Sequence, residues 1–291
     1  MEQLGSTEKR IFIKLSSVKK MGEKIMQKLT QIQIQKGIEY WVKYETPHKN
    51  VVELEEYVDE KELTINCTQL DGVPYYPKYK NTREKKRVLI EWCEFLKENP
   101  YAFTSLYFGT RMPQELFNAV CEQKNLKRLY IKWGAYSDIS AISKLQELEY
   151  LHIGSGASVL SIEPVSELKK LVVLSLENLQ KINDYYALTK LKHLELLSIE
   201  GDVLAPRYIH INNLNFLREM RQLRSFSLTA ARVKSKDYTP ILELENVEYL
   251  SIEARKEVKA IYDQLIKLPK LKYGGVIEHS ELYKSTRKLT I

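Results

Sequence analysis

The chain has few cysteines, no long apolar run and no apolar leader, and each absence excludes a class of protein. Its 291 residues include three cysteines, Cys67, Cys93 and Cys121, which lie far apart among apolar neighbours. This usage is typical of buried, reduced thiols and excludes a disulfide framework or a zinc site. No stretch reaches the roughly 20 apolar residues that a spanning helix needs. The polar N-terminus, MEQLGSTEKR, predicts no signal peptide, no membrane association and a cytoplasmic location.

Catalytic motifs are also absent from the sequence. The five histidines show no metal-ligand spacing, and there is no nucleophile elbow, kinase motif set or pair of acidic residues at catalytic spacing. The glycine-rich stretch 154–158 (GSGAS) lacks the Gly-Lys-Ser/Thr of a phosphate loop, so we interpret it as a tight turn. We therefore expect no enzymatic activity, no cofactor and no metal. An enzyme hidden in the N-terminal region, with the remainder as its substrate adaptor, is the least supported alternative.

Positive charge is concentrated in one segment of the chain. The formal net charge is +7, and residues 75–90 carry six cations against one glutamate, which makes +5. Three tyrosines are interleaved with these cations, a composition that can hold phosphates and stack on unpaired bases. The alternative is a solvated linker that leads into a helix, and we favour it because no basic field surrounds the segment. The candidate nucleic-acid-binding residues are Lys78, Lys80, Arg83, Lys85, Lys86 and Arg87.

A repeated motif organises most of the chain. Residues 126–131 read LKRLYI, with apolar residues at the first, fourth and sixth positions, and the same spacing recurs at 148, 171, 194, 223 and 247. A further copy starts at 103, and a decayed copy starts at 271. Successive copies start 22 to 24 residues apart, with one interval of 29. The last two apolar positions point to the same side of a short strand, and apolar return segments between copies can pack behind it.

This spacing resembles that of the leucine-rich repeat family, over roughly residues 101–277, with a period inside the range of about 20–29 residues. Return segments such as 161–168 (SIEPVSEL) are similar to those of the bacterial, internalin-like subclass. The chain departs from the family in one respect, because the asparagine or cysteine that closes each turn is missing. Those positions hold Gly134, Gly156, Leu179, Asp202, Ala231 and Arg255. The resemblance implies an α/β solenoid with a curved parallel sheet of about seven or eight strands.

Two regions do not follow the repeat. Residues 83–98 and 113–123 read as helices, and we expect 83–123 to form a helical N-terminal cap on a repeat domain that spans 83–291. Residues 1–82 predict a small α+β domain, or an elaborate cap, with strands at 10–15, 38–46 and 62–70. Helical spacing of Val18, Met21, Ile25, Leu29 and Ile32 predicts a helix there as well.

The strand positions that the core does not use are expected to line the concave face of the solenoid. Tyrosine and arginine gather at its N-terminal end, a composition typical of interface anchors. Its C-terminal half has a floor of serines edged by glutamates, which argues against a polyanion along the whole face. The predicted protein-binding residues are Tyr107, Arg128, Tyr130, Lys132, Tyr150, His152, Glu177, Glu200, Tyr249 and Glu253.

From these observations we expect a monomeric, non-catalytic module that recognises another protein on its concave face. An inhibitor or immunity-type partner, which masks a toxin or an enzyme, is one specific form that the resemblance implies. The alternative is a nucleic-acid-associated factor that uses residues 75–90.

Overall fold

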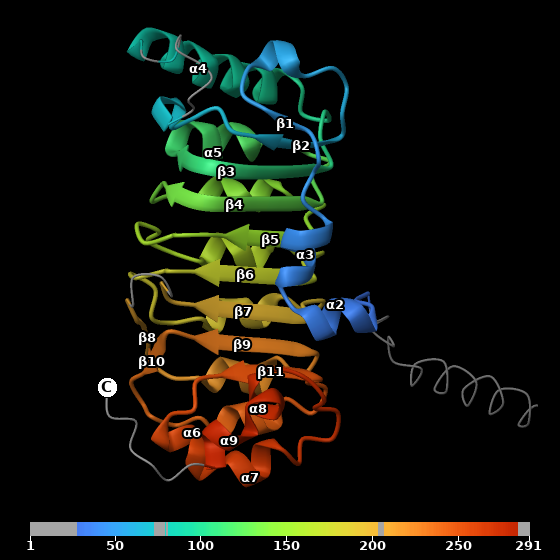
Figure 1. The fold of residues 1–291 in the computed structure, drawn as a ribbon, viewed down its shortest axis with the longest axis vertical. Coiled ribbons are helices and arrows are strands. Elements are labelled where there is room, and N and C mark those ends of the chain that lie inside the picture. Colours follow the sequence, from blue (N-terminus) through green and yellow to red (C-terminus); the bar gives the residue numbers. More distant parts are fainter. Residues whose placement is uncertain (1–27, 73–78, 80, 203–206, 285–291) are drawn as a thin grey trace, which may run out of the picture.

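The structure is a computed structural model that describes residues 28–72, 79, 81–202 and 207–284. In this part of the chain, nine parallel strands form one curved sheet (Figure 1). In spatial order they are β1 Asn50–Val51, β2 Glu62–Ile65, β3 Ser105–Pro113, β4 Arg128–Ala135, β5 Tyr150–Ile153, β6 Val173–Glu177, β7 Leu196–Glu200, β9 Ser225–Thr229 and β11 Tyr249–Ile252. A separate two-stranded sheet pairs β8 Ile209–Ile211 with β10 Ala231–Val233.

The apolar positions of the repeat stack in register. Leu129 pairs with Leu151, and Leu151 pairs with Leu174, so equivalent leucines of successive repeats form a continuous row. All three are fully buried. Because each unit buries its apolar face only against its neighbours, the constant spacing of the motif is what builds the core. The predicted α/β leucine-rich-repeat solenoid is therefore confirmed.

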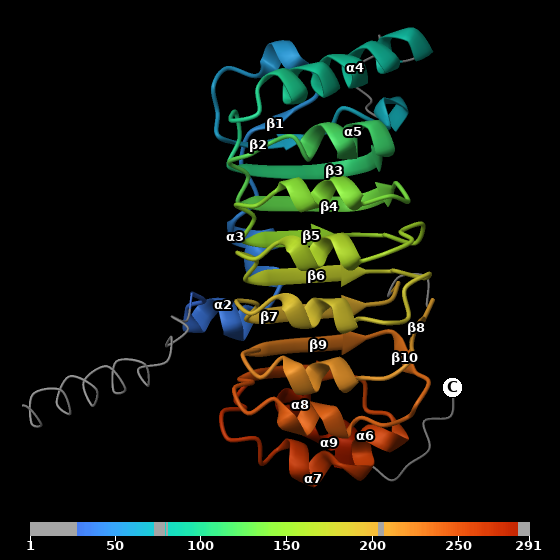
Figure 2. The same cartoon turned by 180° about the vertical axis from the view of Figure 1, so that it is seen from behind.

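Short 3₁₀ helices return the chain on the convex side of the sheet (Figure 2). Each contributes inward residues such as Ile142 and Val165, which are fully buried behind the strands. They are η4 Ser140–Lys144, η5 Glu163–Glu167, η6 Tyr186–Lys190, η7 Asn215–Glu219 and η8 Thr239–Glu243. The predicted buried thiols Cys67, Cys93 and Cys121 lie in the same core without disulfide bonds.

Helices close the two ends of the solenoid. Helix α4 Thr82–Glu98 covers the first strands, begins at the side-chain cap of Asn81, and ends before Pro100. Its Trp92 is fully buried and donates a hydrogen bond to the carbonyl of Val52 over 2.8 Å. Helix α5 Gln114–Val120 joins the first two repeat strands, as predicted. The decayed repeat makes only an isolated bridge between Tyr249 and Tyr273 before the chain turns into helices. The C-terminal helices are α6 Lys256–Ala260, α7 Tyr262–Leu265, α8 Gly275–Glu278 and α9 Ser280–Lys284.

The N-terminal region differs from the prediction in two ways. The predicted strand at 38–46 is wrong: α3 Glu39–Tyr44 occupies it and follows α2 Gln31–Lys36. Strand β2 lies within the predicted 62–70 segment, but it pairs with β3 of the repeat sheet, so the sheet continues across the proposed boundary at residue 82. The division into domains stays a prediction. The strand at 10–15 and Val18, Met21 and Ile25 of the expected helix lie outside the described residues.

Candidate protein-binding face

Outward side chains on the strands form rows across the concave face. Tyr107 pairs with Tyr130, Tyr130 with His152, and His152 with Ser175 on successive strands. The row continues with Ser198, Ser227 and Ser251. The alternation of the strands therefore places these residues side by side, as the sequence predicts.

The first three members of this row stack on one another, and we call them the aromatic ladder. The ring centroids of Tyr107 and Tyr130 are 4.2 Å apart with the planes inclined by 6°. Those of Tyr130 and His152 are 4.2 Å apart with an inclination of 13°. Burial raises the pKa of both tyrosine hydroxyls, so the two phenols are neutral over the physiological range. Both tyrosine side chains remain half-buried, with part of each ring open to solvent.

His152 is the buried end of the ladder and lacks a full set of hydrogen bonds. It is only 6% exposed, and its Nδ1 lies 2.9 Å from Oγ of Ser175. Its Nε2 has no hydrogen-bond partner, and Oε2 of Glu177 lies 3.9 Å from it. Burial lowers the pKa of His152 to about 3, so the imidazole is neutral. The sequence predicts His152 as a contact residue on the outward face of its strand. The structure places it on that face but buried, and its role in binding stays a prediction.

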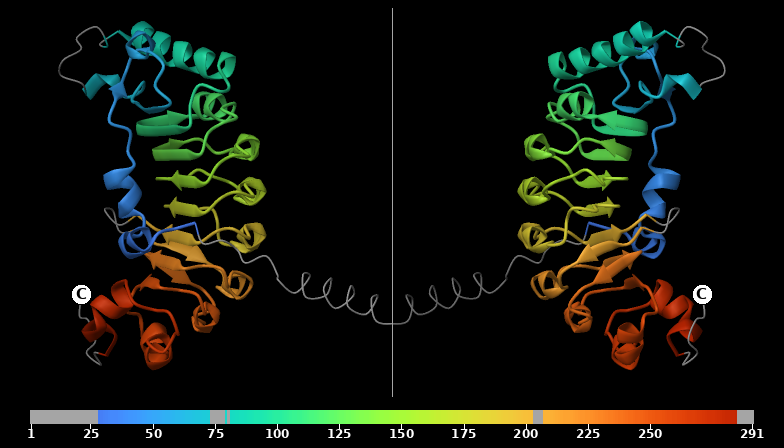
Figure 3. Two further views of the ribbon diagram at one scale, coloured as in Figure 1. Left: turned by 90° about the vertical axis from the view of Figure 1, so that its right-hand side faces the viewer. Right: turned by 90° about the vertical axis from the view of Figure 1, so that its left-hand side faces the viewer.

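A segment of the chain itself crosses the concave face. Residues 28–47, which we call the strap, carry α2 and α3 in front of the strands (Figures 1 and 3). The strap lies over the starts of the strands and buries the outward residues of a second apolar cluster, separate from the main core. From the strap this cluster takes Leu29, Ile34 and Trp41, and from the face Tyr150, Val172, Val173 and Leu196, with Tyr249 packed beside them.

The best-defined contact in this cluster is between two rings. Trp41 stacks on Tyr150 with centroids 5.5 Å apart, and Tyr150 is 4% exposed. The predicted exposure of Tyr150 is therefore wrong, because the strap covers it. Tyr249 is half-buried for the same reason.

A buried charge network fastens the start of the strap. Glu195 accepts hydrogen bonds from the backbone amides of Lys28 (2.6 Å) and Leu29 (3.2 Å). Arg224 donates to the carbonyl of Leu29 over 2.7 Å and pairs with Glu195 (2.9 Å) and Glu248 (2.8 Å). All three charged residues are less than 10% exposed. Their mutual pairing and main-chain contacts compensate the loss of hydration that burial imposes.

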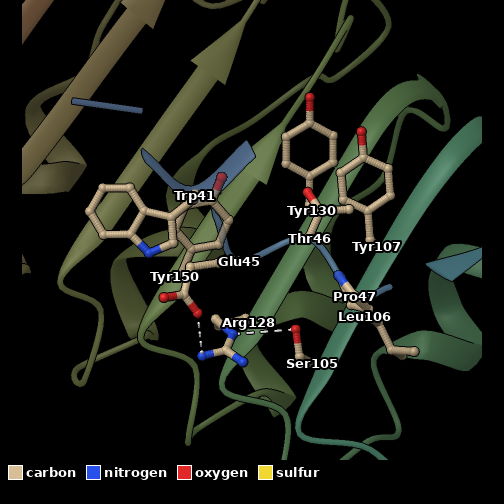
Figure 4. A pocket seen from close by; sticks show the side chains of 10 residues that line it. All are labelled: Trp41, Glu45, Thr46, Pro47, Ser105, Leu106, Tyr107, Arg128, Tyr130 and Tyr150. Carbon is tan, nitrogen blue, oxygen red and sulfur yellow. Dashed lines mark hydrogen bonds and ion pairs between the residues drawn. The ribbon is translucent and has the colours of Figure 1, made fainter. Parts of the chain in front are cut away.

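Arg128 is held by two glutamates. Its guanidinium pairs with Glu45 of the strap over 3.2 Å and with Glu62 of β2 over 2.6 Å, and its Nε donates to Ser105. Figure 4 shows Arg128 with Glu45 and Ser105. They line a small cavity of about 20 Å³ together with Trp41, Tyr150 and the tyrosines of the aromatic ladder. Arg128 therefore fastens the second half of the strap, a role that the sequence does not reveal.

The uncovered part of the concave face lies toward the ends of the strands, and we call it the open face. Its residues are partly or fully exposed. They comprise Tyr107, Tyr130, Lys132, Glu177 and Glu200, all predicted as binding residues. Glu253 lies further along, accepts a hydrogen bond from the amide of Ala230 (2.7 Å) and pairs with Arg255. The structure brings these residues onto one surface; their role in binding stays a prediction.

Sequence reasoning missed the strap residues Trp41 and Glu45 and the network of Glu195, Arg224 and Glu248. A signal for them existed in the outward positions. Val173 and Leu196 are apolar in a column that should face water, and both are about 2% exposed or less. An apolar pair on an outward face indicates that another segment covers it.

The basic segment is largely engaged in intramolecular contacts where the structure describes it. Arg87 pairs with Glu53 (3.0 Å), Glu84 (3.0 Å) and Glu91 (2.7 Å). Tyr79 is fully buried and donates to Glu53 over 2.7 Å, so it is not free to stack on a base. Lys85 pairs with Asp71, while Arg83 and Lys86 are exposed. Lys78 and Lys80 lie outside the described residues.

The described residues contain neither a candidate metal site nor a candidate membrane-spanning helix. Within them, no group of histidine, cysteine, aspartate and glutamate has an arrangement that could hold a metal ion. No helix in the same part of the chain has the length and apolar character needed to cross a bilayer.

Solved structures with this fold were found, although no family model and no curated protein matches the chain. An internalin of Listeria monocytogenes is 18% identical with a TM-score of 0.40, over 60% of this chain and 54% of that one. A leucine-rich-repeat protein of Leptospira interrogans is 15% identical with a TM-score of 0.41, over 78% and 76%. The Arabidopsis receptor kinase HAESA, solved with the peptide hormone IDA and the co-receptor SERK1, is 14% identical with a TM-score of 0.37, over 54% and 32%.

These similarities concern the architecture alone. The chain spans 54% and 62% of the length of two Listeria internalins that it matches, and all identities reported are below 25%. The in-register leucine rows establish the class of fold independently. The molecule is a leucine-rich-repeat solenoid whose concave face is partly covered by its own N-terminal strap.

Proposed function

We propose that this protein is a non-catalytic module that binds another protein on its open face. The observation that carries the proposal is the aromatic ladder, in which two half-exposed tyrosines stack at 4.2 Å outside the main core. Large aromatic rings on a concave surface are typical of interface anchors, because they bury much area with little loss of side-chain entropy. Lys132 and the two glutamates beside the ladder supply the polar rim that such anchors need.

Other features support a binding role over catalysis. The ionisable residues of the face are arranged in rows across the strands. The buried His152 is neutral, with only Ser175 as a hydrogen-bonded neighbour. A masking partner of the inhibitor or immunity type is a specific form of this proposal, since an extended concave face can cover a large patch of another protein. The three buried, unbonded cysteines support a reducing, cytoplasmic compartment.

The test uses a partner identified by affinity capture and then purified. Calorimetry should show that Tyr107→Ala and Tyr130→Ala each weaken binding by about 30-fold, the range of an interface hot spot. Tyr186→Ala is the matched control, because this tyrosine is 55% exposed on η6 at the convex side. If both ladder variants bind as tightly as the control while keeping the wild-type circular dichroism spectrum, the proposal is wrong.

A further inference from the structure

The strap contacts the concave face at spaced points and leaves hollows between them. Its buried apolar anchors are Leu29, Ile34 and Trp41, and they belong to a cluster separate from the main core. Trp41 lines two cavities of about 20 and 180 Å³, and a cleft of about 420 Å³ lies between the serine floor and the strap at 35–39. Protein cores are packed without such gaps. The strap therefore packs like a ligand seated in a groove.

The covered surface, which we call the strap groove, holds the start of the strap through its main chain. The groove is formed by Arg128, Tyr150, Val173, Glu195, Leu196 and Arg224. The carboxylate of Glu195 accepts hydrogen bonds from two consecutive backbone amides, and Arg224 donates to the carbonyl oxygen of Leu29. These contacts involve no side chain of the strap, so the backbone of another segment can take them.

Two further contacts depend on the side chains of the strap. The ring of Trp41 stacks on Tyr150. The carboxylate of Glu45, one helical turn later, pairs with Arg128 over 3.2 Å. A segment that replaces the strap must therefore offer an aromatic ring and, one turn later, an acidic side chain.

The strap can leave the groove without disturbing the repeats. Its helices α2 and α3 have six residues each, too few to be stable alone in water. Among the described residues, no backbone–backbone hydrogen bond joins residues 28–45 to a strand, so opening costs the sheet none of its own. Arg224 also pairs with Glu195 and Glu248 of the face, and these ion pairs keep the charges compensated when the strap leaves.

The strap groove continues into the open face. Trp41, Thr46 and Pro47 line the same small cavity as the ladder tyrosines Tyr107 and Tyr130 (Figure 4). A partner that is anchored on the ladder is therefore next to the groove when the strap opens.

We propose that the strap groove binds a segment of the protein partner, and that the strap occupies the groove until the partner displaces it. This inference rests on the proposed function and adds a second contact region with its own regulation. The partner segment carries an aromatic residue for Tyr150 and, one helical turn later, an acidic residue for Arg128. An aliphatic residue earlier in the segment covers Val173 and Leu196, and its main chain takes the hydrogen bonds that the start of the strap makes.

The experiment uses the full chain and, as its probe, a fluorescent peptide with the sequence of residues 28–45. The Ile34→Asp/Trp41→Asp variant changes two anchors of the strap and no residue of the groove, so it should release the strap. Fluorescence anisotropy should show that this variant binds the probe about tenfold more tightly than the wild type, whose groove is occupied. A probe that carries Leu29→Asp and Trp41→Asp should not bind.

The matched control is Ile32→Asp/Val42→Asp. It adds the same charges on the outer side of the strap, where the two residues are 46% and 43% exposed, and it should bind the probe as weakly as the wild type. Hydrogen exchange should be faster at 31–44 in the anchor variant and unchanged in β6 and β7. If β6 and β7 also lose protection, the milder Trp41→Ala replaces it. A released strap without tighter probe binding overturns the inference, and so does a strap that stays closed in both anchor variants.

A second measurement separates this inference from the proposed function. The purified partner should bind the Ile34→Asp/Trp41→Asp variant about tenfold more tightly than the wild type, because it no longer has to displace the strap. It should also accelerate hydrogen exchange at 31–44 in the wild type. If affinity and exchange are both unchanged while Tyr130→Ala still weakens binding, the strap inference is wrong and the open-face function stands. If Tyr130→Ala has no effect either, both fail.

Discussion

Trp41 lies stacked on Tyr150, with ring centroids 5.5 Å apart and planes inclined by 20°. The two rings come from the strap and from the start of β5, so their contact closes one side of the concave face. Tyr150 would otherwise be an exposed aromatic on the sheet, and Trp41 leaves it 4% exposed. The stack therefore determines which part of the face is available to a partner.

Replacing Trp41 with alanine should loosen the strap without unfolding the repeats. The strap cluster is separate from the main core, so the loss of about 3–5 kcal/mol expected for a buried tryptophan acts mainly on local opening. Hydrogen exchange of the amides at 31–44 should accelerate at least tenfold, while those of β6 and β7 keep their rates. Trp133→Ala removes a tryptophan that is 42% exposed, and it should change the exchange rates neither of the strap amides nor of β6 and β7. Equal acceleration in β6 would contradict local opening.

Replacing Arg224 with methionine should destabilise the protein strongly. The change leaves Glu195 and Glu248 buried without their cation, and removing one partner of a buried ion pair typically costs about 3–5 kcal/mol. Urea unfolding measures the loss of the free energy of unfolding. Arg221→Met is the control, because its side chain is 62% exposed and reaches Glu243 only at 3.7 Å. A loss below about 1 kcal/mol for Arg224→Met would show that the network contributes little.

The repeat architecture could be predicted because each repeat has the same local pattern of buried and outward-facing residues. Leu126, Leu129 and Ile131 are fully buried, and the residues between them, Arg128 and Tyr130, face outward. The period of the motif determines the register of every strand, so the rows on the concave face follow from the sequence alone.

The strap could not be predicted because its structure depends on distant partners. Tyrosine, tryptophan and valine at 40–42 have high strand propensity, but packing of Trp41 against Tyr150 favours a short helix there. The hydrogen bonds of Glu195 to the strap backbone join residues more than 160 positions apart. Local periodicity contains no information about such contacts.

Replacing Gly154 with alanine should distort the neighbouring strand. A Cβ atom there would lie 2.2 Å from the carbonyl oxygen of Lys132, so the backbone of β4 or β5 must move. We expect a loss of about 1–3 kcal/mol in the free energy of unfolding, measured with urea. Gly275→Ala is the control, since its Cβ would meet only side-chain oxygens, that of Ser251 at 3.3 Å and that of Tyr283 at 3.7 Å. Similar losses of the free energy of unfolding in the two variants would show that the close backbone approach at Gly154 does not require a glycine there.

The buried imidazole of His152 should make the stability of the protein depend on pH. Burial lowers its pKa from 6.5 to about 3, so between these values the unfolded chain binds a proton at His152 that the folded protein does not. Stability therefore rises with pH through this window, by about 1.4 kcal/mol per unit, and the contribution is complete above pH 6.5. The neighbouring carboxylate Glu177 has a pKa that burial raises, so its contribution to stability falls as the pH rises. The contribution of His152 is therefore measured as the difference in the pH dependence of stability between the wild type and a His152 variant.

The measurement is urea unfolding at a series of pH values for the wild type, His152→Gln and His210→Gln. Between pH 6.5 and 4.5 the wild type should lose about 2–3 kcal/mol more than His152→Gln, because glutamine has no proton to gain. His210 is exposed on β8, so its replacement should leave the wild-type slope unchanged. Parallel slopes for the wild type and His152→Gln would mean that the imidazole is protonated over the same pH range in the folded protein as in the unfolded chain, which would contradict this prediction.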